Sequence, residues 1–328
     1  MQTHAPSSSE RRPPRPAPAI LARGVRQRLG GTDVVNGLDI EVSPGTIFGF
    51  IGPSGSGKTT TIRMLTGIQQ PTDGRVEVLG KPPAAFTTKD RARIGYLPQL
   101  SVLFPELSLW QNLSFVASIY GLGWPRRRRL RRVLELVELW DDRRKRLRDA
   151  SGGMQRRLAL AAALVHDPEV MFLDEPTAGV DPVLRRKFWE RLEALRDEGR
   201  TLFVTTQYVG EAAYCDVVGV ISDGWLVALD TPDGLRRRAL GGQLLDIRTV
   251  EPVDEATMAQ LCRLQPVLRC DRVGADGQQL RVVVERAAEA VPRIADWFDD
   301  RGVPLESIRE EQPPFDDVFV ALVQGGRS

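Results

Sequence analysis

One short stretch near the start of the chain combines residue types that bind phosphate. It follows an apolar run, residues 47–51, and leads into residues 60–65, which are expected to form a helix. Its members are, in order, Gly52, Pro53, Ser54, Gly55, Ser56, Gly57, Lys58 and Thr59. Two glycines separated by four residues and followed by Lys and Thr, between a strand and a helix, form the phosphate-binding loop pattern. Because such glycines let backbone N–H groups point at one anion, the sequence predicts a phosphate site.

The last residues of this stretch add a charge and a metal ligand. Lys58 brings a compact positive charge for the outer phosphates of a nucleotide. Thr59 offers a hydroxyl oxygen to Mg²⁺, an ion that usually keeps several waters and shares phosphate oxygens of the substrate. We expect the next residue, Thr60, to line the same phosphate site.

Polar side chains follow three later apolar runs. Two carboxylates, Asp174 and Glu175, end the run 170–174, and the amides of Gln99 and Gln207 each follow another such run. A carboxylate at a strand end can hold a metal ion or polarise a water molecule. Two carboxylates in different environments can take different tasks. The pair is therefore a candidate for metal binding and for activation of a water molecule.

Two further segments stand just ahead of predicted helices. Ser151, Gly152 and Gly153 precede an alanine-rich helix. Glycines at that place weaken the helix unless its backbone N–H groups must approach another molecule closely. Asp181 stands in a turn just before the helix that runs to Leu195.

The elements that must position these residues alternate along the chain. Strands followed by helices predict an α/β fold with a mainly parallel sheet and helices on both faces. Short alternating runs at 20–25 and 38–42, separated by glycine turns, predict an antiparallel strand layer ahead of it. Helical periodicity from 108 to 147 predicts an inserted helical layer. One apolar face of that layer is expected to carry Leu109, Leu113, Val116 and Ile119.

The order of the motifs is distinctive when they are taken together. They are the phosphate loop, Tyr96-Leu97-Pro98-Gln99, Ser151-Gly152-Gly153, Asp174-Glu175, Asp181 and Thr205-Thr206-Gln207. The chain resembles the ATP-binding subunit of an ABC transporter, a P-loop NTPase, over about residues 18–235, with a helical subdomain at about 100–160. The resemblance implies ATP and Mg²⁺ as ligands, a second ATP-binding subunit as a homodimer partner, and a separate transmembrane permease.

The resemblance also implies a role for each motif. Two copies would sandwich ATP, with each phosphate loop facing the other copy's Ser151-Gly152-Gly153 and with Gln155 close by. Asp174 would hold the Mg²⁺ shell and Glu175 would act as general base. Gln99 would touch the metal or the water, and Asp181 would line the dimer seam.

Three positions depart from the family pattern. Gln207 stands where a histidine is usual, and an amide can donate a hydrogen bond to a γ-phosphate but cannot become cationic. We therefore expect slowed rather than abolished hydrolysis. Leu29 stands where an aromatic residue usually stacks on adenine, so we expect loose selectivity for the base. Ala150 replaces the leucine that normally begins the Ser-Gly-Gly motif.

The composition of the whole chain limits its partners. Forty-five basic and 43 acidic side chains leave a formal net charge of +2, which points to no nucleic acid. No apolar run approaches the ~18–20 residues that cross a bilayer, so we expect a peripheral protein at the cytoplasmic face of the membrane, bound through the permease. Residues 1–17 carry too little apolar surface to fold and are expected to form a disordered tail.

The three cysteines are an odd number without metal-ligand spacing, which suits a reducing compartment. Cys262 and Cys270 are expected to pack as small apolar groups.

The last hundred residues, 236–328, predict a separate α+β accessory domain. Their pattern reads strand 244–250, helix 255–264, strand 267–273, strand 280–285, a helix through Trp297 and Phe298, and a strand near 305–309. That βαββαβ order is ferredoxin-like. The closing helix after Pro313-Pro314 resembles the ending of drug and lipid exporter ATPases, which favours export. The domain itself is expected to stabilise a dimer without a ligand site of its own.

Two surfaces allow alternative interpretations. The arginine run 126–132 is either a solvated helix face or a contact for anionic lipid headgroups. The apolar side chains between Gln99 and Phe115 either receive a short helix of the permease or form core of the helical layer; they include Leu100, Leu103, Phe104, Leu107 and Trp110. Two other functions also stay open: an ABC-type ATPase acting on ribosomes or DNA, and a regulatory nucleotide sensor with little turnover.

Overall fold

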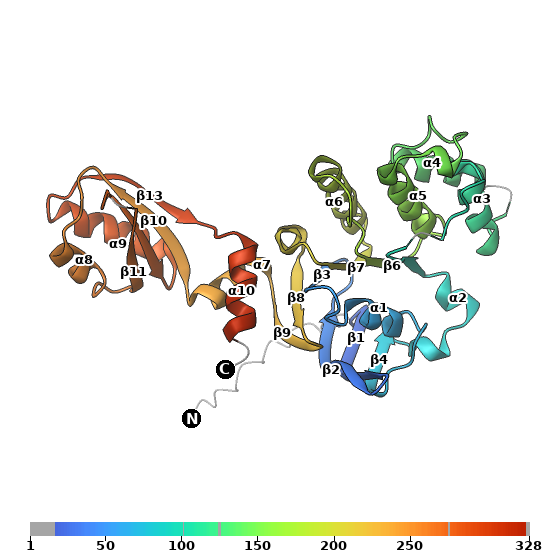
Figure 1. Cartoon of the computed structure of the whole chain (residues 1–328), viewed down its shortest axis with the longest axis horizontal. Coiled ribbons are helices and arrows are strands. Elements are labelled where there is room, and N and C mark those ends of the chain that lie inside the picture. Colours follow the sequence, from blue (N-terminus) through green and yellow to red (C-terminus); the bar gives the residue numbers. More distant parts are fainter. Residues whose placement is uncertain (1–16, 101, 124–125, 275, 326–328) are drawn as a thin grey trace, which may run out of the picture.

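The computed structural model describes residues 17–100, 102–123, 126–274 and 276–325. Apart from Ala17, the predicted disordered tail lies outside these residues. The described chain contains three sheets, and Figure 1 shows two of them at one end of an elongated molecule and the third at the other end.

The largest sheet has six strands in the order β5-β6-β7-β3-β8-β9 and is parallel except for the antiparallel pair β8 and β9. The strands are β3 (Ile47–Ile51), β5 (Ile94–Leu97), β6 (Val170–Asp174), β7 (Thr201–Thr206), β8 (Val217–Ser222) and β9 (Trp225–Asp230). Its central strands are buried on both faces, which explains their continuous apolar runs. The predicted mainly parallel sheet is confirmed.

The second sheet is the predicted antiparallel layer, in the order β2-β1-β4. Its strands are β1 (Ile20–Leu29), β2 (Thr32–Val42) and β4 (Asp73–Val78). Helix α1 (Lys58–Leu65) lies between the two sheets, because its buried Ile62, Met64 and Leu65 join a core that includes Phe48 and Phe50 of β3. Short elements follow this layer: η1 (Pro83–Ala85) and α2 (Thr88–Arg91).

Helices cover the other face of the parallel sheet, as Figure 1 shows. They are α3 (Leu109–Ile119), α4 (Arg126–Leu136), η2 (Leu147–Asp149), α5 (Gly152–Leu164), α6 (Pro182–Asp197) and η3 (Val209–Tyr214). The core on this side contains Leu109, Leu113 and Leu130 together with Ile47 and Ile51 of β3. The predicted helical layer is therefore present. One residue of the predicted apolar face is exposed: Ile119 is 67 % exposed, because the buried face of α3 carries Leu113 and Ala117, and Ile119 lies about 200° around the helix from Ala117.

The third sheet is wholly antiparallel and has the order β11-β12-β10-β13. Its elements are β10 (Gln243–Thr249), α8 (Glu255–Leu261), β11 (Val267–Val273), β12 (Gln279–Val284), α9 (Ala287–Asp299) and β13 (Leu305–Glu311). The chain order βαββαβ is the predicted one. Helix α8 ends three residues earlier than expected, and its apolar contacts belong to a separate core that also holds Ile294 and Phe298.

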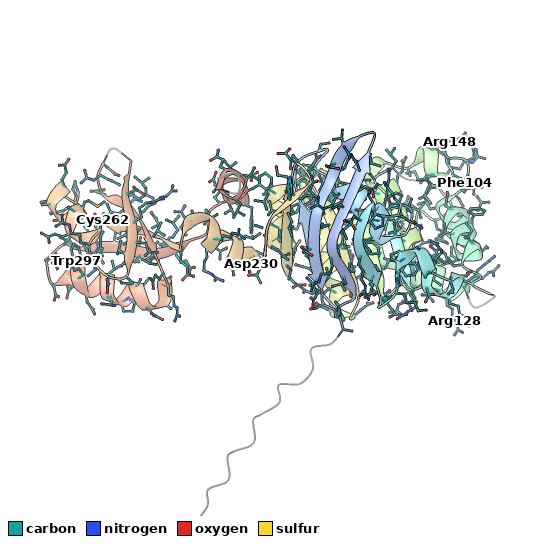
Figure 2. The ribbon with its side chains drawn as sticks, turned by 90° about the horizontal axis from the view of Figure 1, so that it is seen from below. Phe104, Arg128, Arg148, Asp230, Cys262 and Trp297 are labelled. Carbon is teal, nitrogen blue, oxygen red and sulfur yellow. A yellow bond between two sulfur atoms is a disulfide. The ribbon has the colours of Figure 1, made fainter. Side chains whose placement is uncertain are left out.

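The closing helix α10 (Phe315–Gly325) leaves this sheet and packs beside α7 (Pro232–Leu240) and η3. Its buried Phe315, Val318 and Leu322 share the core of the helical side of the large sheet. By packing, α10 belongs with that core although it lies in the segment 236–328. Figure 2 shows Trp297 and Cys262 at one end of the molecule, Phe104 and Arg128 at the other, and Asp230 between them.

The cysteines differ from expectation. Cys262 and Cys270 are joined in a disulfide, with their Cα atoms 5.5 Å apart, whereas Cys215 is free and buried. The prediction that Cys262 and Cys270 pack as separate apolar groups is therefore wrong. The pairing arises because Cys262, the residue just after α8, faces Cys270 in the middle of β11, a juxtaposition that the linear spacing does not reveal. No helix of the described chain is long and apolar enough to span a bilayer.

Candidate functional site

The site is built where β3 ends and α1 begins, at the carboxyl edge of the parallel sheet. Gly55 and Gly57 adopt positive φ angles of 80° and 105°, which side chains with a Cβ rarely adopt. A Cβ on Gly52 would lie 2.1 Å from the carbonyl oxygen of Ile221. The Oγ atom of Ser56 is buried and has no partner among the described residues. The loop is thus a close backbone cradle at a helix N-terminus, which suits an anion.

Lys58 lies in this cradle with its ammonium group turned back over the loop. Its Nζ atom donates to the carbonyl oxygens of Gly52 and Pro53, both at 2.8 Å, and lies 3.5 Å from Oε1 of Glu175. Burial lowers the pKa of Lys58, while the neighbouring Glu175 acts in the opposite direction. The arrangement holds one positive charge between the loop and the end of β6.

Asp174, the last residue of β6, is almost fully buried. Its Oδ1 atom accepts hydrogen bonds from Oγ1 of Thr205 at 2.7 Å and from Oγ1 of Thr59 at 3.2 Å. Its Oδ2 atom is buried without a hydrogen-bond partner in the described chain. A buried carboxylate oxygen without a donor is costly, and a cation beside it would satisfy it.

Glu175 follows directly and has an unusual backbone. Its φ of +47° lies in the left-handed region, and its N–H donates to both the carbonyl oxygen and Oγ1 of Thr205. The Nε2 atom of Gln99 donates to Oε2 of Glu175 at 3.2 Å. Together with Lys58, Gln99 therefore engages both carboxylate oxygens. The structure brings the phosphate loop, Gln99, Asp174 and Glu175 together as the sequence predicts.

Three other predicted residues lie on or next to elements of the two N-terminal sheets. Gln207 is exposed directly after β7, whose Thr205 and Thr206 pair in register with Asp174 and Ile51. Leu29, at the end of β1, is 42 % exposed. Thr60 is half-buried in the first turn of α1.

The Ser-Gly-Gly motif lies at the start of α5, separate from the loop. Ser151 caps the helix by accepting a hydrogen bond from the N–H of Met154, and Ser151 and Gly152 are exposed. Within the described residues no hydrogen bond joins Ser151, Gly152 or Gly153 to the phosphate loop. The amide of Gln155 turns back to the carbonyl oxygens of Leu147 and Ala150, at 3.3 and 3.1 Å.

Asp181 is exposed and caps α6, because its Oδ1 atom accepts from the N–H groups of Val183 and Leu184.

Sequence reasoning missed two residues that order the site. Thr205 bridges Asp174 and the backbone of Glu175, and its place beside Asp174 in a parallel pair could have indicated this. Arg156 donates to the backbone of the segments that carry Gln99 and Glu175. No sequence signal marks those contacts, because the acceptors are main-chain carbonyl groups.

Comparison with known proteins agrees with this geometry. The family model described as ABC transporter matches residues 35–178. The chain is 36 % identical over 311 residues to the daunorubicin resistance ATP-binding protein DrrA3 of Streptomyces coeruleorubidus, covering 94 % of this chain and 97 % of that protein. The chain belongs to the ATP-binding subunits of ABC transporters. The Nod factor export ATP-binding protein I of Cupriavidus pinatubonensis is 38 % identical over 238 residues, 71 % of this chain and 73 % of its own.

Solved structures of this ABC family share the fold. A structure titled as the ATP binding subunit of an ABC transporter superposes with a TM-score of 0.61 at 26 % identity, covering 67 % of this chain and 92 % of that chain. CbiO1 from Clostridium perfringens, part of the ABC transporter complex cbiONQ, gives a TM-score of 0.61 at 25 % identity, covering 76 % and 96 %. This ABC subunit is accordingly an ATP-binding ATPase whose hydrolysis is coupled to transport.

Proposed function

We propose that this subunit hydrolyses Mg²⁺-bound ATP at the carboxyl edge of its parallel sheet and thereby powers export through a separate permease. One observation carries the chemistry: Glu175 stands beside the phosphate loop, 3.5 Å from Lys58, with Gln99 on its other oxygen. A carboxylate so placed is within reach of a water molecule that attacks the outermost phosphate bound over the loop.

The residues around Asp174 fit a magnesium ion. Thr59, Asp174 and Gln99 would hold it, and the unpartnered Oδ2 atom of Asp174 is the strongest support. Within the described residues no group of three or more His, Cys, Asp or Glu side chains could hold a metal. Such a sparse protein shell suits Mg²⁺, which keeps waters and shares phosphate oxygens. When bound, the ion would neutralise phosphate charge and orient the substrate.

The remaining side chains divide the work on the substrate. Lys58 and the loop N–H groups bind the outer phosphates, and Glu175 takes the proton of the attacking water. Gln207, exposed beside the site, donates an amide hydrogen bond to the terminal phosphate. Leu29 contacts the base without stacking on it. Thr60 supports the phosphates from the first turn of α1.

The site is proposed to be completed by a second copy of the chain. Ser151, Gly152 and Gly153 lie at a helix N-terminus, where the first N–H groups have no partner within the helix, which makes them a suitable partner for the phosphates held by another copy's loop. Asp181 would line the seam between the copies. Gln155 contributes indirectly, because its amide holds the turn that presents Ser151.

The permease is proposed to dock on the loop that follows Gln99. Leu100 and Val102 are 82 % and 81 % exposed, and the exposed Phe104 packs edge-on against Phe115 with ring centroids 5.1 Å apart. Residues 104–108 of this segment are held in place, because Asn112 is fully buried and hydrogen-bonds to their backbone atoms. Such an exposed apolar surface suits a short helix of a partner.

Trp110 contributes less to that surface than its sequence position suggested. It is half-buried and packs edge-on against Trp140, with centroids 6.0 Å apart, so it is partly core of the helical layer. Export is favoured because the relatives are named for drug resistance and for Nod factor export. Docking to a permease would place the subunit peripherally at the cytoplasmic face of the membrane.

The test is ATP hydrolysis by the full chain alone and after co-purification with its permease in lipid vesicles. We expect the permease to stimulate turnover, and the Glu175→Gln variant to bind ATP without turning it over. Hydrolysis that the permease leaves unchanged would argue for a function away from the membrane. ATP binding without any hydrolysis would indicate a nucleotide sensor.

A further inference from the structure

Arg156, in the first turns of α5 three residues after Gly153, makes an unusual set of contacts. Its guanidinium group donates to five backbone carbonyl oxygens. The acceptors are those of Pro176 at 2.7 Å, Pro98 at 3.0 Å, Gln99 at 3.0 Å, Asp174 at 2.9 Å and Glu175 at 2.7 Å. Arginine has five N–H groups, so this side chain has a donor for each acceptor.

The five acceptors belong to two segments that carry the hydrolytic side chains. Three consecutive carbonyl groups, at 174–176, come from the end of β6, and two, at 98–99, come from the loop after β5. One guanidinium group therefore fixes the backbone of both Glu175 and Gln99. Burial lowers the pKa of Arg156, while Asp174 and Glu175 act in the opposite direction. The guanidinium group of arginine stays charged in proteins.

The hydrogen bonds of Arg156 matter most at Glu175. A residue with a Cβ persists at a positive φ only where its surroundings determine the conformation. Glu175 is held at +47° by Thr205 on its N–H side and by Arg156 on its carbonyl side. Loss of the Arg156 contacts would free three peptide groups and let the carboxylate leave its place between Lys58 and Gln99.

We propose that Arg156 is a positioning residue that binds the start of the Ser-Gly-Gly helix to the hydrolytic edge of the sheet. The start of α5, with residues 151–153, is thereby tied to the backbone of Gln99 and Glu175. Binding of a second subunit to α5 would thus act directly on the positions of the Glu175 carboxylate and the Gln99 amide. The inference rests on the proposed hydrolytic roles of Glu175 and Gln99.

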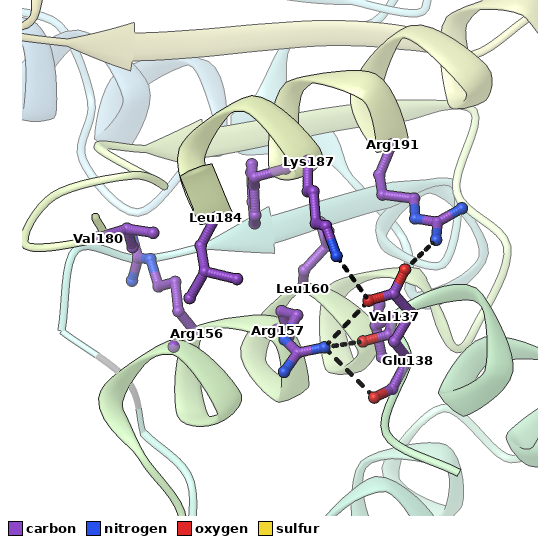
Figure 3. A pocket seen from close by; sticks show the side chains of 11 residues that line it. Val137, Glu138, Arg156, Arg157, Leu160, Val180, Leu184, Lys187 and Arg191 are labelled. Atoms are coloured by element: carbon purple, nitrogen blue, oxygen red, sulfur yellow. Dashed lines mark hydrogen bonds and ion pairs between the residues drawn. The ribbon is translucent and has the colours of Figure 1, made fainter. Parts of the chain in front are cut away.

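The neighbouring arginine provides a matched control. Figure 3 shows Arg157 directed toward Val137 and Glu138, whereas Arg156 points to the other side, beside Val180. Arg157 donates to the carbonyl oxygens of Val137 and Glu138 at 3.1 and 3.3 Å. Its Nη1 atom lies 3.6 Å from the Glu138 carboxylate, which also pairs with Lys187 and Arg191. Arg157 therefore supports the helical layer and not the hydrolytic edge.

The experiment compares Arg156→Met, Arg156→Lys and Arg157→Met in the full chain. The readouts are kcat for ATP with the permease present, the Kd for ADP, and the melting temperature. We expect Arg156→Met to lower kcat at least tenfold while the ADP Kd changes less than threefold, because the phosphate loop keeps its contacts. Arg156→Lys should recover part of kcat, since an ammonium group has three donors. Arg157→Met should keep kcat within twofold of the wild type.

The contrary outcomes separate this inference from the proposed function. If the wild type hydrolyses ATP and Arg156→Met keeps kcat within twofold, Arg156 does not position the site. The same conclusion follows if Arg156→Met and Arg157→Met lower kcat, ADP affinity and melting temperature alike, which indicates a structural role only. If Arg156→Met does not fold, a folded Arg156→Lys variant with full kcat overturns the inference. A wild type that hydrolyses no ATP overturns the proposed function and this inference with it.

Discussion

The Nζ atom of Lys58 lies 3.5 Å from Oε1 of Glu175, and both side chains are almost completely buried. This pair joins the phosphate loop of α1 to the end of β6, two segments more than a hundred residues apart in the chain. Gln99 holds the other carboxylate oxygen. The carboxylate is therefore kept against the phosphate site by partners on both sides, which is the geometry that a general base for hydrolysis needs.

Replacing Glu175 by Gln should abolish most hydrolysis. The amide keeps the shape of the side chain but cannot take a proton, and a positioned general base typically contributes about 10²–10⁴ in rate. We expect kcat to fall by about that factor while ATP still binds. Single-turnover hydrolysis and equilibrium binding of ATP measure the two separately. Turnover close to wild type in Glu175→Gln would assign the base to another residue.

Replacing Gln207 by His should raise turnover. A cationic imidazole makes a stronger, charge-assisted hydrogen bond to phosphate than an amide. We expect an increase of roughly threefold to tenfold, equivalent to about 1 kcal/mol of transition-state stabilisation. The variant should also gain a pH dependence of kcat near neutral pH, which the wild-type amide lacks. A lower turnover in Gln207→His would contradict the expectation.

Leu29 predicts loose selectivity for the nucleotide base. Because Leu29 offers no ring for stacking on adenine, GTP should bind the site about as tightly as ATP does and should therefore compete with it. Leu29 is 42 % exposed, so Leu29→Trp should leave the core intact. Base–aromatic stacking of ~1–3 kcal/mol would tighten ATP binding by roughly fivefold or more. Competition binding with both nucleotides tests this, and strict ATP specificity of the wild type would count against it.

His166 should make folding stability depend on pH. Its Nε2 atom lies 2.9 Å from the carbonyl oxygen of Ile94, and its ring stacks on Tyr120 at 3.7 Å. Burial lowers the pKa of His166, and the charges of Arg129 and Arg200 lower it further, against the effect of the Ile94 bond. Below an unfolded pKa of about 6.5 the unfolded chain takes up a proton that the folded chain resists.

His166 therefore contributes its full stabilisation above the unfolded pKa of about 6.5. This stabilisation is lost as the pH falls from that value toward the lower pKa of the folded state. Melting temperatures between pH 8 and 5 measure this loss. The variant His166→Phe should show a smaller decline across the same range. Equal declines in the two proteins would assign the acid sensitivity to other groups.

Phe315 should stabilise the core on the helical side of the large sheet, although it lies near the end of the chain. It is 6 % exposed, and the guanidinium group of Arg236 lies 4.1 Å from its ring centre. Truncation of a buried Phe to Ala typically costs about 3–5 kcal/mol. We expect Phe315→Ala to lower the free energy of unfolding by about 3 kcal/mol, seen in denaturant titration. Val320, on the same helix and 51 % exposed, is the control, and Val320→Ala should change it by less than about 0.5 kcal/mol.

The sequence alone determined the phosphate loop, the strand-end carboxylates and the class of the sheet. These features depend on local rules: glycine spacing between a strand and a helix, and apolar runs that end in polar residues. The βαββαβ order of the third sheet follows from periodicity in the same way. Each strand, helix or loop in these patterns is encoded by neighbouring residues, and their order along the chain is read directly, so one sequence suffices.

Only the tertiary structure decided which distant segments meet. The five acceptors of Arg156 are carbonyl groups, which every residue carries, so no residue type announces them. Two other outcomes depend on how helices end and where they pack. One is the pairing of Cys262 with Cys270, and the other is the packing of Phe315 into the core on the helical side of the large sheet. Ile119 is apolar and yet exposed, because the face of α3 that packs against the core carries Leu113 and Ala117 instead. Long-range packing, which a local pattern does not contain, set each of these outcomes.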